Sequence, residues 1–184
     1  MRITGGSHRG RILTSPSDDR IRPTADKTRL AVFNMLQARQ GIVDTTVIDA
    51  FCGTGALGLE ALSRGAKQAI LFDADAASLA LARKNTQDLR LDHQTTCLLQ
   101  DATKLPRRLE KLAPASLVFL DPPYRQNMVI PALISLQAGD WLAHKALCVI
   151  ETEKEYTPQI PSGFRIIQQK SYGQSTIYLV MFDA

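Results

Sequence analysis

The residues best suited to chemistry follow the apolar segment 117–120, where an aspartate, two prolines and a tyrosine stand in a row. An apolar run that ends in a charged residue predicts a buried strand with Asp121 at its carboxyl edge. The Asp121 carboxylate and the Pro122 carbonyl accept hydrogen bonds, and neither Pro122 nor Pro123 has an N–H to donate. Tyr124 adds a flat face for a planar ring. These residues predict a pocket that receives a donor such as an amino group, although a plain proline turn with a surface aspartate has the same local sequence.

A second candidate site is the segment 49–58, which carries a GxGxxG pattern between a predicted strand and a predicted helix. Gly53 and Gly55 let the backbone close around a ligand and direct N–H groups at it. Asp73 follows Gly53 by twenty residues, at the end of the next predicted strand, where an acid can accept both hydroxyls of a ribose. Asp101 ends a third predicted strand, where side chain and backbone could hold an adenine. Together these features fit a nucleoside.

The kind of cofactor follows from Asp49, which precedes Gly53 by four residues. A nicotinamide dinucleotide places its pyrophosphate at the helix N-terminus, and a nearby acid would gain little from that anion. S-adenosylmethionine carries a sulfonium and an ammonium and no phosphate, so Asp49 suits its charged end. We therefore expect S-adenosylmethionine, in a pocket formed by Asp49, Phe51, Gly53, Gly55, Leu57, Asp73, Ala74, Asp101 and Ala102.

Alternating strands and helices must position these motifs. Hydrophobic periodicity and turn residues predict strands over 46–51, 68–73, 95–99, 116–120 and 146–151. Helices are predicted over 25–37, 56–63, 76–89, 104–112 and 128–136, the first capped by Thr24 with Leu30, Phe33, Met35 and Leu36 as its apolar positions. The last two strands, 164–169 and 176–182, have no helix between them. The fold class predicted is α/β, with a doubly wound, mostly parallel sheet closed by a C-terminal antiparallel hairpin.

The charge of the chain is concentrated near its start. The chain of 184 residues has a net charge of +4, and residues 1–29 hold seven Lys or Arg against three Asp, which equals the whole excess. Gly5, Gly6 and Gly10 around Arg9 and Arg11 predict a turn between two short strands. A basic arm on a neutral body is expected of a protein that binds the phosphates of a nucleic acid, although a solvated charged tail has the same composition.

Other compositional features exclude several classes of protein. The chain has no apolar stretch of membrane-spanning length and no secretory signal at Met1, so we expect a cytoplasmic protein without membrane contact. Cys52, Cys97 and Cys148 form no CxxC pair and have no histidine at ligand spacing, which argues against a metal site and a disulfide framework. We expect Cys97 and Cys148 to fill the core.

Taken together, the chain resembles the RsmD family of 16S rRNA guanine-N2 methyltransferases, within the Rossmann-like S-adenosylmethionine-dependent methyltransferases. The resemblance covers essentially the full length and rests on these segments: Arg2-Ile3, Gly5-Gly6, Arg9-Gly10-Arg11, Arg22-Pro23-Thr24, Asp26, Arg29, Phe33-Asn34, 49–55, 57–61, 63–66, 121–124 and 173–175. The family usually has Glu where this chain has Leu30, which puts one contact to the methionine end of the cofactor in question.

The resemblance implies methyl transfer to the exocyclic N2 of one guanine in bacterial 16S rRNA, presented in an assembling small ribosomal subunit. It implies a single methyltransferase domain over 1–184, with a basic β-hairpin/helix appendage whose arm is 1–23 and a catalytic body over 24–184. A monomer is favoured, and no metal is needed. The alternatives are an amino-group methylase acting on adenine or guanine in another RNA or DNA, and a catalytically silent nucleic-acid-binding relative.

The residues assign roles within that reaction. Asp121 and the Pro122 carbonyl would accept the protons of the amino group, which frees electron density toward the methyl group, and Tyr124 would stack on the base. Guanine suits Asp121 better than adenine, because its N1–H and N2–H donors lie side by side. Substrate contacts are expected from Arg9, Arg11, Arg22 and Pro123.

Overall fold

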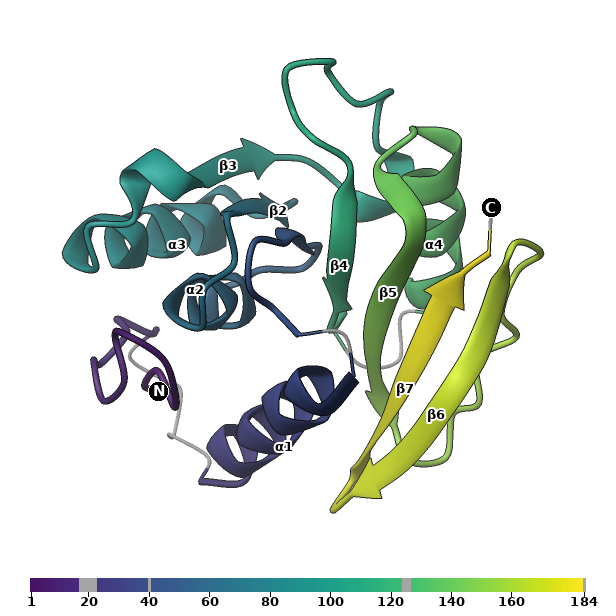
Figure 1. Cartoon of the computed structure of the whole chain (residues 1–184), viewed down its shortest axis with the longest axis horizontal. Coiled ribbons are helices and arrows are strands. Elements are labelled where there is room, and N and C mark those ends of the chain that lie inside the picture. Colours follow the sequence, from purple (N-terminus) through teal and green to yellow (C-terminus); the bar gives the residue numbers. More distant parts are fainter. Residues whose placement is uncertain (17–22, 40, 124–126, 184) are drawn as a thin grey trace.

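A seven-stranded sheet organises the part of the chain that the structure describes. The structure is a computed structural model that describes residues 1–16, 23–39, 41–123 and 127–183. Its strand order is β3-β2-β1-β4-β5-β7-β6. The strands are β1 Thr46–Asp49, β2 Gln68–Asp73, β3 Thr95–Leu99, β4 Ala115–Leu120, β5 Leu142–Glu153, β6 Phe164–Tyr172 and β7 Ser175–Phe182. β1 to β5 pair in parallel, whereas β7 runs antiparallel to both β5 and β6 (Figure 1). The predicted fold class is confirmed.

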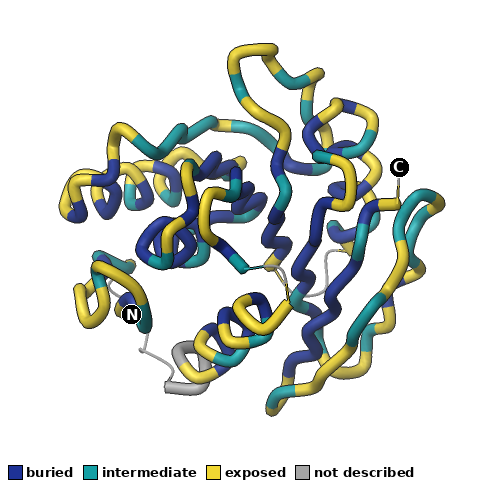
Figure 2. The backbone as a smooth tube through the Cα atoms, in the orientation of Figure 1, coloured by how far each residue is buried: buried dark blue, intermediate teal, exposed yellow. Residues whose placement is uncertain are grey.

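Helices cover both faces of this sheet. They are α1 Pro23–Arg39, α2 Ala56–Ser63, α3 Ala76–Asp88 and α4 Val129–Ala138, with short 3-10 helices at η1 Asp92–Gln94 and η2 Ala102–Lys104. α1, α2 and α3 share one hydrophobic core cluster with the sheet, and α4 shares the other. Successive strand side chains alternate between the two clusters, as Leu71 and Phe72 do in β2. The buried strands therefore lie in the middle of the molecule (Figure 2).

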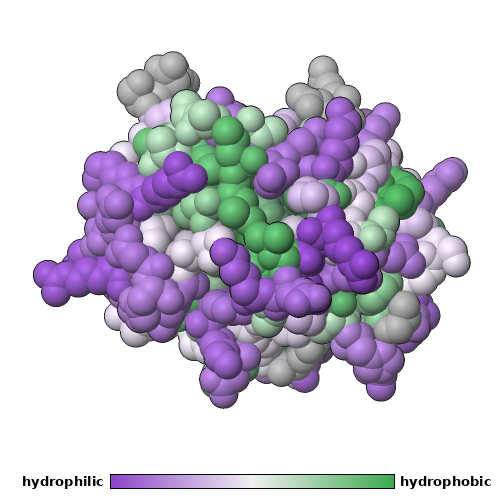
Figure 3. Space-filling model, turned by 90° about the horizontal axis from the view of Figure 1, so that it is seen from above, coloured by the Kyte–Doolittle hydropathy of each residue, from purple (hydrophilic) through white to green (hydrophobic). Residues whose placement is uncertain are grey.

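The helix predicted over 104–112 is wrong. Only η2 forms there, and the chain then continues through an irregular segment that reaches β4 from the top of Figure 1. Pro106 explains the difference, because a proline disfavours helical backbone at the residue before it, and Leu105 is extended with φ −65° and ψ 138°. Trp141 Nε1 then donates to the Pro106 carbonyl at 2.8 Å. From this end the surface is mostly hydrophilic, with apolar side chains gathered near its middle (Figure 3).

The first helix differs from its prediction at two positions. α1 begins at Pro23, so Thr24 lies inside the first turn and is not the cap. Proline suits that first position because its missing N–H has no intrahelical partner there. Phe33 and Leu36 are buried as expected, and the Phe33 ring lies 5.4 Å from that of Phe119 in β4. Leu30 is 40% exposed, so its assignment to the apolar face was wrong.

Residues 1–16 form a hairpin-like arm that packs on the rest of the protein. An isolated antiparallel bridge joins Arg2 and Ile12, and the Ile3 N–H donates to the Arg11 carbonyl at 2.9 Å. The arm is anchored to the end of α2, where the Ser7 N–H donates to the Ser63 carbonyl at 2.7 Å. The predicted turn between two short extended segments is present, although these segments are too short to count as strands.

A buried carboxylate holds the arm, α1 and α2 together. Glu60 in α2 has no exposed surface. Its carboxylate accepts a hydrogen bond from Arg29 Nε of α1 at 3.1 Å and from Arg64 Nη2 at 2.8 Å. The Thr4 N–H of the arm donates to the same carboxylate at 2.9 Å. Because a buried charge is costly unless it is paired, this cluster fixes the three segments relative to one another.

Two compositional expectations can be compared with the described ranges. Cys52 and Cys148 are buried, Cys97 is partly buried, and all three are free thiols. Cys148 belongs to one core cluster and Cys97 packs against the other, as expected of core residues. No helix within these ranges is both long and apolar enough to cross a membrane.

Candidate active site

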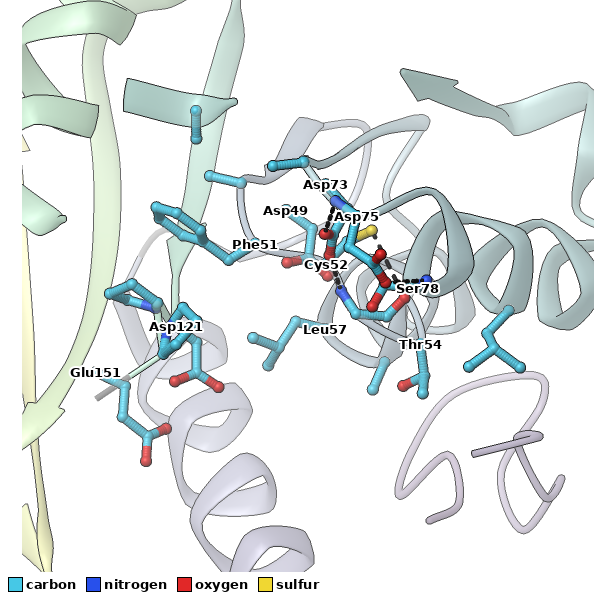
Figure 4. Close-up of a pocket in the computed structure, with 18 of the residues that line it drawn as sticks. Asp49, Phe51, Cys52, Thr54, Leu57, Asp73, Asp75, Ser78, Asp121 and Glu151 are labelled. Carbon is cyan, nitrogen blue, oxygen red and sulfur yellow. Dashed lines mark hydrogen bonds between the residues drawn. The ribbon is translucent and has the colours of Figure 1, made fainter. Parts of the chain in front are cut away.

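The candidate site lies at the carboxyl ends of the parallel strands, where the strand order reverses between β1 and β4. In open α/β sheets ligands bind at such a switch point. A cavity of about 740 Å³ occupies this place, lined by residues that follow β1, β2, β3 and β4 and by residues of β5, α1 and α2. Asp49, Asp73, Asp121 and Glu151 lie around the same cavity in Figure 4. The sequence motifs predicted to form a site therefore meet at one edge of the sheet.

The glycine loop forms the wall between β1 and α2. Gly53 has φ +52°, a conformation that favours glycine, and its N–H donates to Asp73 Oδ2 at 2.8 Å. Gly58 lies so close to the sheet that an added Cβ would be 2.4 Å from Leu71 Cδ2. Gly55 is the N-cap of α2 and does not line the cavity, whereas Gly53 does. The loop thus links the first two strand ends through a backbone-to-carboxylate hydrogen bond.

Asp49 is a buried carboxyl at the end of β1. It is 1% exposed, and its Oδ2 accepts a hydrogen bond from the Gly58 N–H at 3.0 Å. Burial raises the pKa of Asp49 to about 7, against the opposing effect of the Gly58 hydrogen bond, and the charge of Asp73 adds to the rise. A cation bound beside Asp49 would lower this pKa again, because it favours the ionised form of the carboxyl.

The other two acids of the predicted cofactor pocket are oriented by backbone groups. Asp73 Oδ1 accepts the Asp75 N–H at 2.9 Å, so each Asp73 oxygen has one backbone donor and a further lone pair. Asp101 Oδ1 accepts from the Thr103 hydroxyl at 2.6 Å and from its N–H at 2.9 Å, and these bonds lower the pKa of Asp101. Both carboxylates line the cavity with lone pairs left to accept further hydrogen bonds. Phe51, Leu57, Ala74 and Ala102 also line it, as predicted.

Asp121 lies on the other side of the switch point, directly after β4. Its side chain faces the cavity opening and is exposed there, although protein surrounds it on the remaining sides. Desolvation by this surrounding protein, followed by the charges of Glu151 and Asp49, raises the pKa of Asp121 well above its ordinary value. Pro122 and Pro123 line the cavity too, and Tyr124 lies outside the described residues.

Two of the predicted substrate residues, Arg9 and Arg11, lie away from these acids, whereas a third, Pro123, lines the cavity beside Asp121. Arg9 and Arg11 are exposed on the arm and do not line the cavity. Arg11 Nη2 donates to the Asp88 carbonyl at 3.2 Å, which ties the arm to the end of α3. Arg22 lies outside the described residues. Met1 and Pro16, at the two ends of the arm, do line the cavity, so the arm borders the opening that a substrate would enter.

Sequence reasoning missed Glu151 of β5. The residue lines the cavity next to Asp121. A signal was present, since Glu151 ends the predicted strand 146–151 as Asp73 ends the predicted strand 68–73. Met1, Pro16 and Arg29 were not predicted either, because their place at the cavity depends on how the arm and α1 pack against the sheet.

Comparison with known proteins agrees with this geometry. The family model described as "Conserved hypothetical protein 95" matches residues 1–181. Ribosomal RNA small subunit methyltransferase D of Escherichia coli is 35% identical over 185 residues, which cover 100% of this chain and 91% of that protein. The Haemophilus influenzae protein of the same name is 32% identical over 174 residues, 94% of this chain and 89% of the relative. The solved structure of yhhF from Escherichia coli superposes with a TM-score of 0.84 at 32% identity, covering 100% of this chain and 98% of that one.

Proposed function

The chain belongs to the family of the small-subunit ribosomal RNA methyltransferases D, the RsmD family, and from this premise we propose that it methylates N2 of one guanine in 16S rRNA. It is a methyltransferase, and a methyl donor of the S-adenosylmethionine type follows from that activity. The observation that carries the proposal for this chain is a cavity with acids after four of its parallel strands. Asp121, the aspartate of the amino-accepting motif, is one of them.

We propose S-adenosylmethionine itself as the donor because the charges of the cavity fit it. Arg29 is the arginine that lines the described cavity, and its guanidinium donates to Glu60 and to the Arg2 carbonyl. Acids without a phosphate-binding cation suit a ligand with a sulfonium and an ammonium, and they disfavour a pyrophosphate. A volume of about 740 Å³ also lies within the range of about 300–1,000 Å³ that is usual for small-molecule sites.

Each acid then has a distinct role in holding the donor. Asp73 would accept the ribose hydroxyls, and Asp101 with Ala102 would hold the adenine. Asp49 would face the positive end, while Phe51, Leu57 and Ala74 supply apolar contact. The donor supplies an already activated methyl group, so the protein needs neither a covalent nucleophile nor a metal for the transfer.

The substrate side of the cavity has to orient an amino nitrogen and exclude water. Ionised Asp121 and the Pro122 carbonyl accept the protons of the amino group, which holds the nitrogen lone pair toward the methyl group. The base leaves its stack to enter, and Tyr124 and Pro123 pack against its face. Because Asp121 must be ionised to accept, its raised pKa predicts that transfer increases as the pH rises through that pKa.

The arm extends the proposal to the RNA around the base. Arg9, Arg11 and Arg22 would bind phosphates, next to an opening bordered by Met1 and Pro16. We propose one domain over 1–184, in which the arm 1–23 binds RNA and the body 24–184 performs the transfer. It would act in the cytoplasm, as a monomer, on rRNA within an assembling small subunit.

Methyl transfer from a tritiated donor to small-subunit rRNA, naked and in assembling particles, tests the proposal. The modified nucleotide is then mapped, and N2-methylguanine is the expected product. Asp121→Ala should retain donor binding and lose transfer by about 10²-fold or more. Glu110→Ala, an exposed carboxylate in a turn away from the cavity, is the matched control. Methyladenine in the product, or label in DNA, would support the alternative methylase, and near-normal transfer by Asp121→Ala would remove Asp121 from the mechanism.

A further inference from the structure

Glu151 and Asp121 occupy neighbouring positions on two parallel strands. The register of β4 and β5 pairs Leu120 with Ile150, so the next residues on each strand stand side by side. Neighbouring strands lie about 4.8 Å apart. Leu120 and Ile150 both belong to the core cluster under α4, so the residues that follow them point to the opposite face. Figure 4 shows both carboxylates directed toward α1 at the edge of the cavity.

A pair of acids at this place is an unusual arrangement in a stable sheet. Like charges at adjacent positions of a sheet are unfavourable, and the charge of Glu151 contributes to the raised pKa of Asp121. A cavity carboxyl whose pKa is shifted by desolvation and by a specific neighbouring charge, as that of Asp121 is, marks a candidate functional site. Asp121 already has the amino group as its proposed partner, which leaves the function of the second acceptor to be explained.

We propose that Glu151 is a specificity-determining residue that identifies the ring of the substrate base by accepting its N1–H. This inference rests on the proposed function, in which Asp121 binds the N2 amino group. Guanine presents N1–H and N2–H side by side on its Watson–Crick edge, so two donors meet two neighbouring acceptors.

Adenine presents an unprotonated N1 beside its amino group. That lone pair would face the Glu151 carboxylate, which has no proton to donate when ionised, so two acceptors would oppose each other. A site built to bind a donor rejects a ligand without it far more strongly than an apolar pocket does. Glu151 thus strengthens the preference for guanine that the Asp121 carboxylate alone gives only weakly, because Asp121 also accepts from the amino group of adenine.

The test uses 2-aminopurine, which keeps the 2-amino group of guanine but has an unprotonated N1. An rRNA substrate carries either guanine or 2-aminopurine at the mapped position, and kcat/KM for methyl transfer is measured on both. The wild-type enzyme should prefer guanine by about 10²-fold or more. In Glu151→Gln the amide can rotate to donate to N1, so the preference should fall to about tenfold or less.

The control variant is Glu153→Gln, two residues further along β5 and outside the cavity, which should keep the wild-type ratio. If Glu151 only stabilises the strand end, Glu151→Gln will lower transfer to both bases by the same factor, and the unchanged ratio overturns the inference. A wild-type enzyme that methylates both bases equally well overturns it too. Wild-type enzyme that transfers no methyl group to the guanine substrate would instead refute the proposed function, before any variant is compared.

Discussion

The buried carboxyl of Asp49 should make binding of the methyl donor release a proton. With a pKa of about 7, Asp49 is roughly three-quarters protonated at pH 6.5 in the free protein. A bound cation favours the ionised form, so the proton leaves as the donor binds. If the pKa of the bound state returns to about 4, the affinity should be roughly tenfold lower at pH 6 than at pH 8. The affinity must fall as the pH is lowered, because Asp49 is protonated below its pKa and then has no negative charge to attract a cationic ligand.

Titration calorimetry in buffers of different ionisation enthalpy measures this release. At pH 6.5 the observed enthalpy, plotted against buffer enthalpy, should give about 0.7 proton released per S-adenosylmethionine bound, and about 0.1 at pH 8. Asp49→Asn should abolish the release and the pH dependence of the affinity. Asp75→Asn is the matched control, because Asp75 lines the same cavity while its hydrogen bond to the Ser78 N–H lowers the pKa of its carboxyl. It should leave the proton release unchanged.

Two outcomes would refute this reasoning. A binding enthalpy that is independent of the buffer at pH 6.5 would mean that Asp49 is already ionised, or that no cation binds near it. Release that persists in Asp49→Asn but disappears in Asp121→Asn would assign the proton to Asp121, whose pKa is raised as well. In that case the positive end of the donor would lie nearer to β4 than to β1.

Three other variants test the packing and the arm. Glu60→Ala removes the buried partner of two arginines and should lower the free energy of unfolding by about 3–5 kcal/mol. An unchanged midpoint of urea unfolding would contradict this expectation. Gly58→Ala should lower the free energy of unfolding by about 1–3 kcal/mol, since the new Cβ would lie 2.4 Å from Leu71 Cδ2. Wild-type stability in calorimetry would show that the Leu71 side chain moves aside without strain. Replacing Arg9 and Arg11 together with Ala should weaken rRNA binding and reduce its log–log salt slope by about 1.4. Lys111→Ala, exposed in the turn before β4 and outside the cavity, is the control, and an unaltered slope would indicate a solvated arm.

The sequence predicted most of the sheet because its strands are short apolar runs with local end signals. β3 occupies the predicted 95–99, and α2 the predicted 56–63. The helix expected over 104–112 failed because Pro106 imposes extended backbone before it and Trp141, far along the chain, binds its carbonyl. Local periodicity contains no information about such a contact.

The candidate site shows the same division between local and long-range information. The acids at the ends of β1 and β2 were predicted because motifs of fixed spacing identify them. Glu151 was missed, since its role depends on the register that pairs Leu120 with Ile150, thirty residues away. Arg29 was predicted only as part of a motif. Its pairing with Glu60 could not be predicted, because it depends on how α1 packs on α2. The residues at the ends of strands can thus be predicted from the sequence, whereas the residues that they contact on neighbouring strands and helices cannot.

The acids of the cavity divide at the point where the strand order reverses. Asp49 and Asp73 end β1 and β2, and Asp101 lies shortly after β3. On the other side, Asp121 follows β4 and Glu151 lies near the end of β5. The two sets interact at the switch point, since the charge of Asp49 helps to raise the pKa of Asp121. Where Asp49 is already ionised in the free protein, above its pKa of about 7, a cation bound beside it would offset its charge, so the proposed function predicts a lower pKa for Asp121 and a better acceptor for the amino group. In the proposed reaction the donor leaves as a neutral thioether, which would no longer offset the Asp49 charge, so the proposal predicts that the methylated base binds less tightly than the unmethylated one.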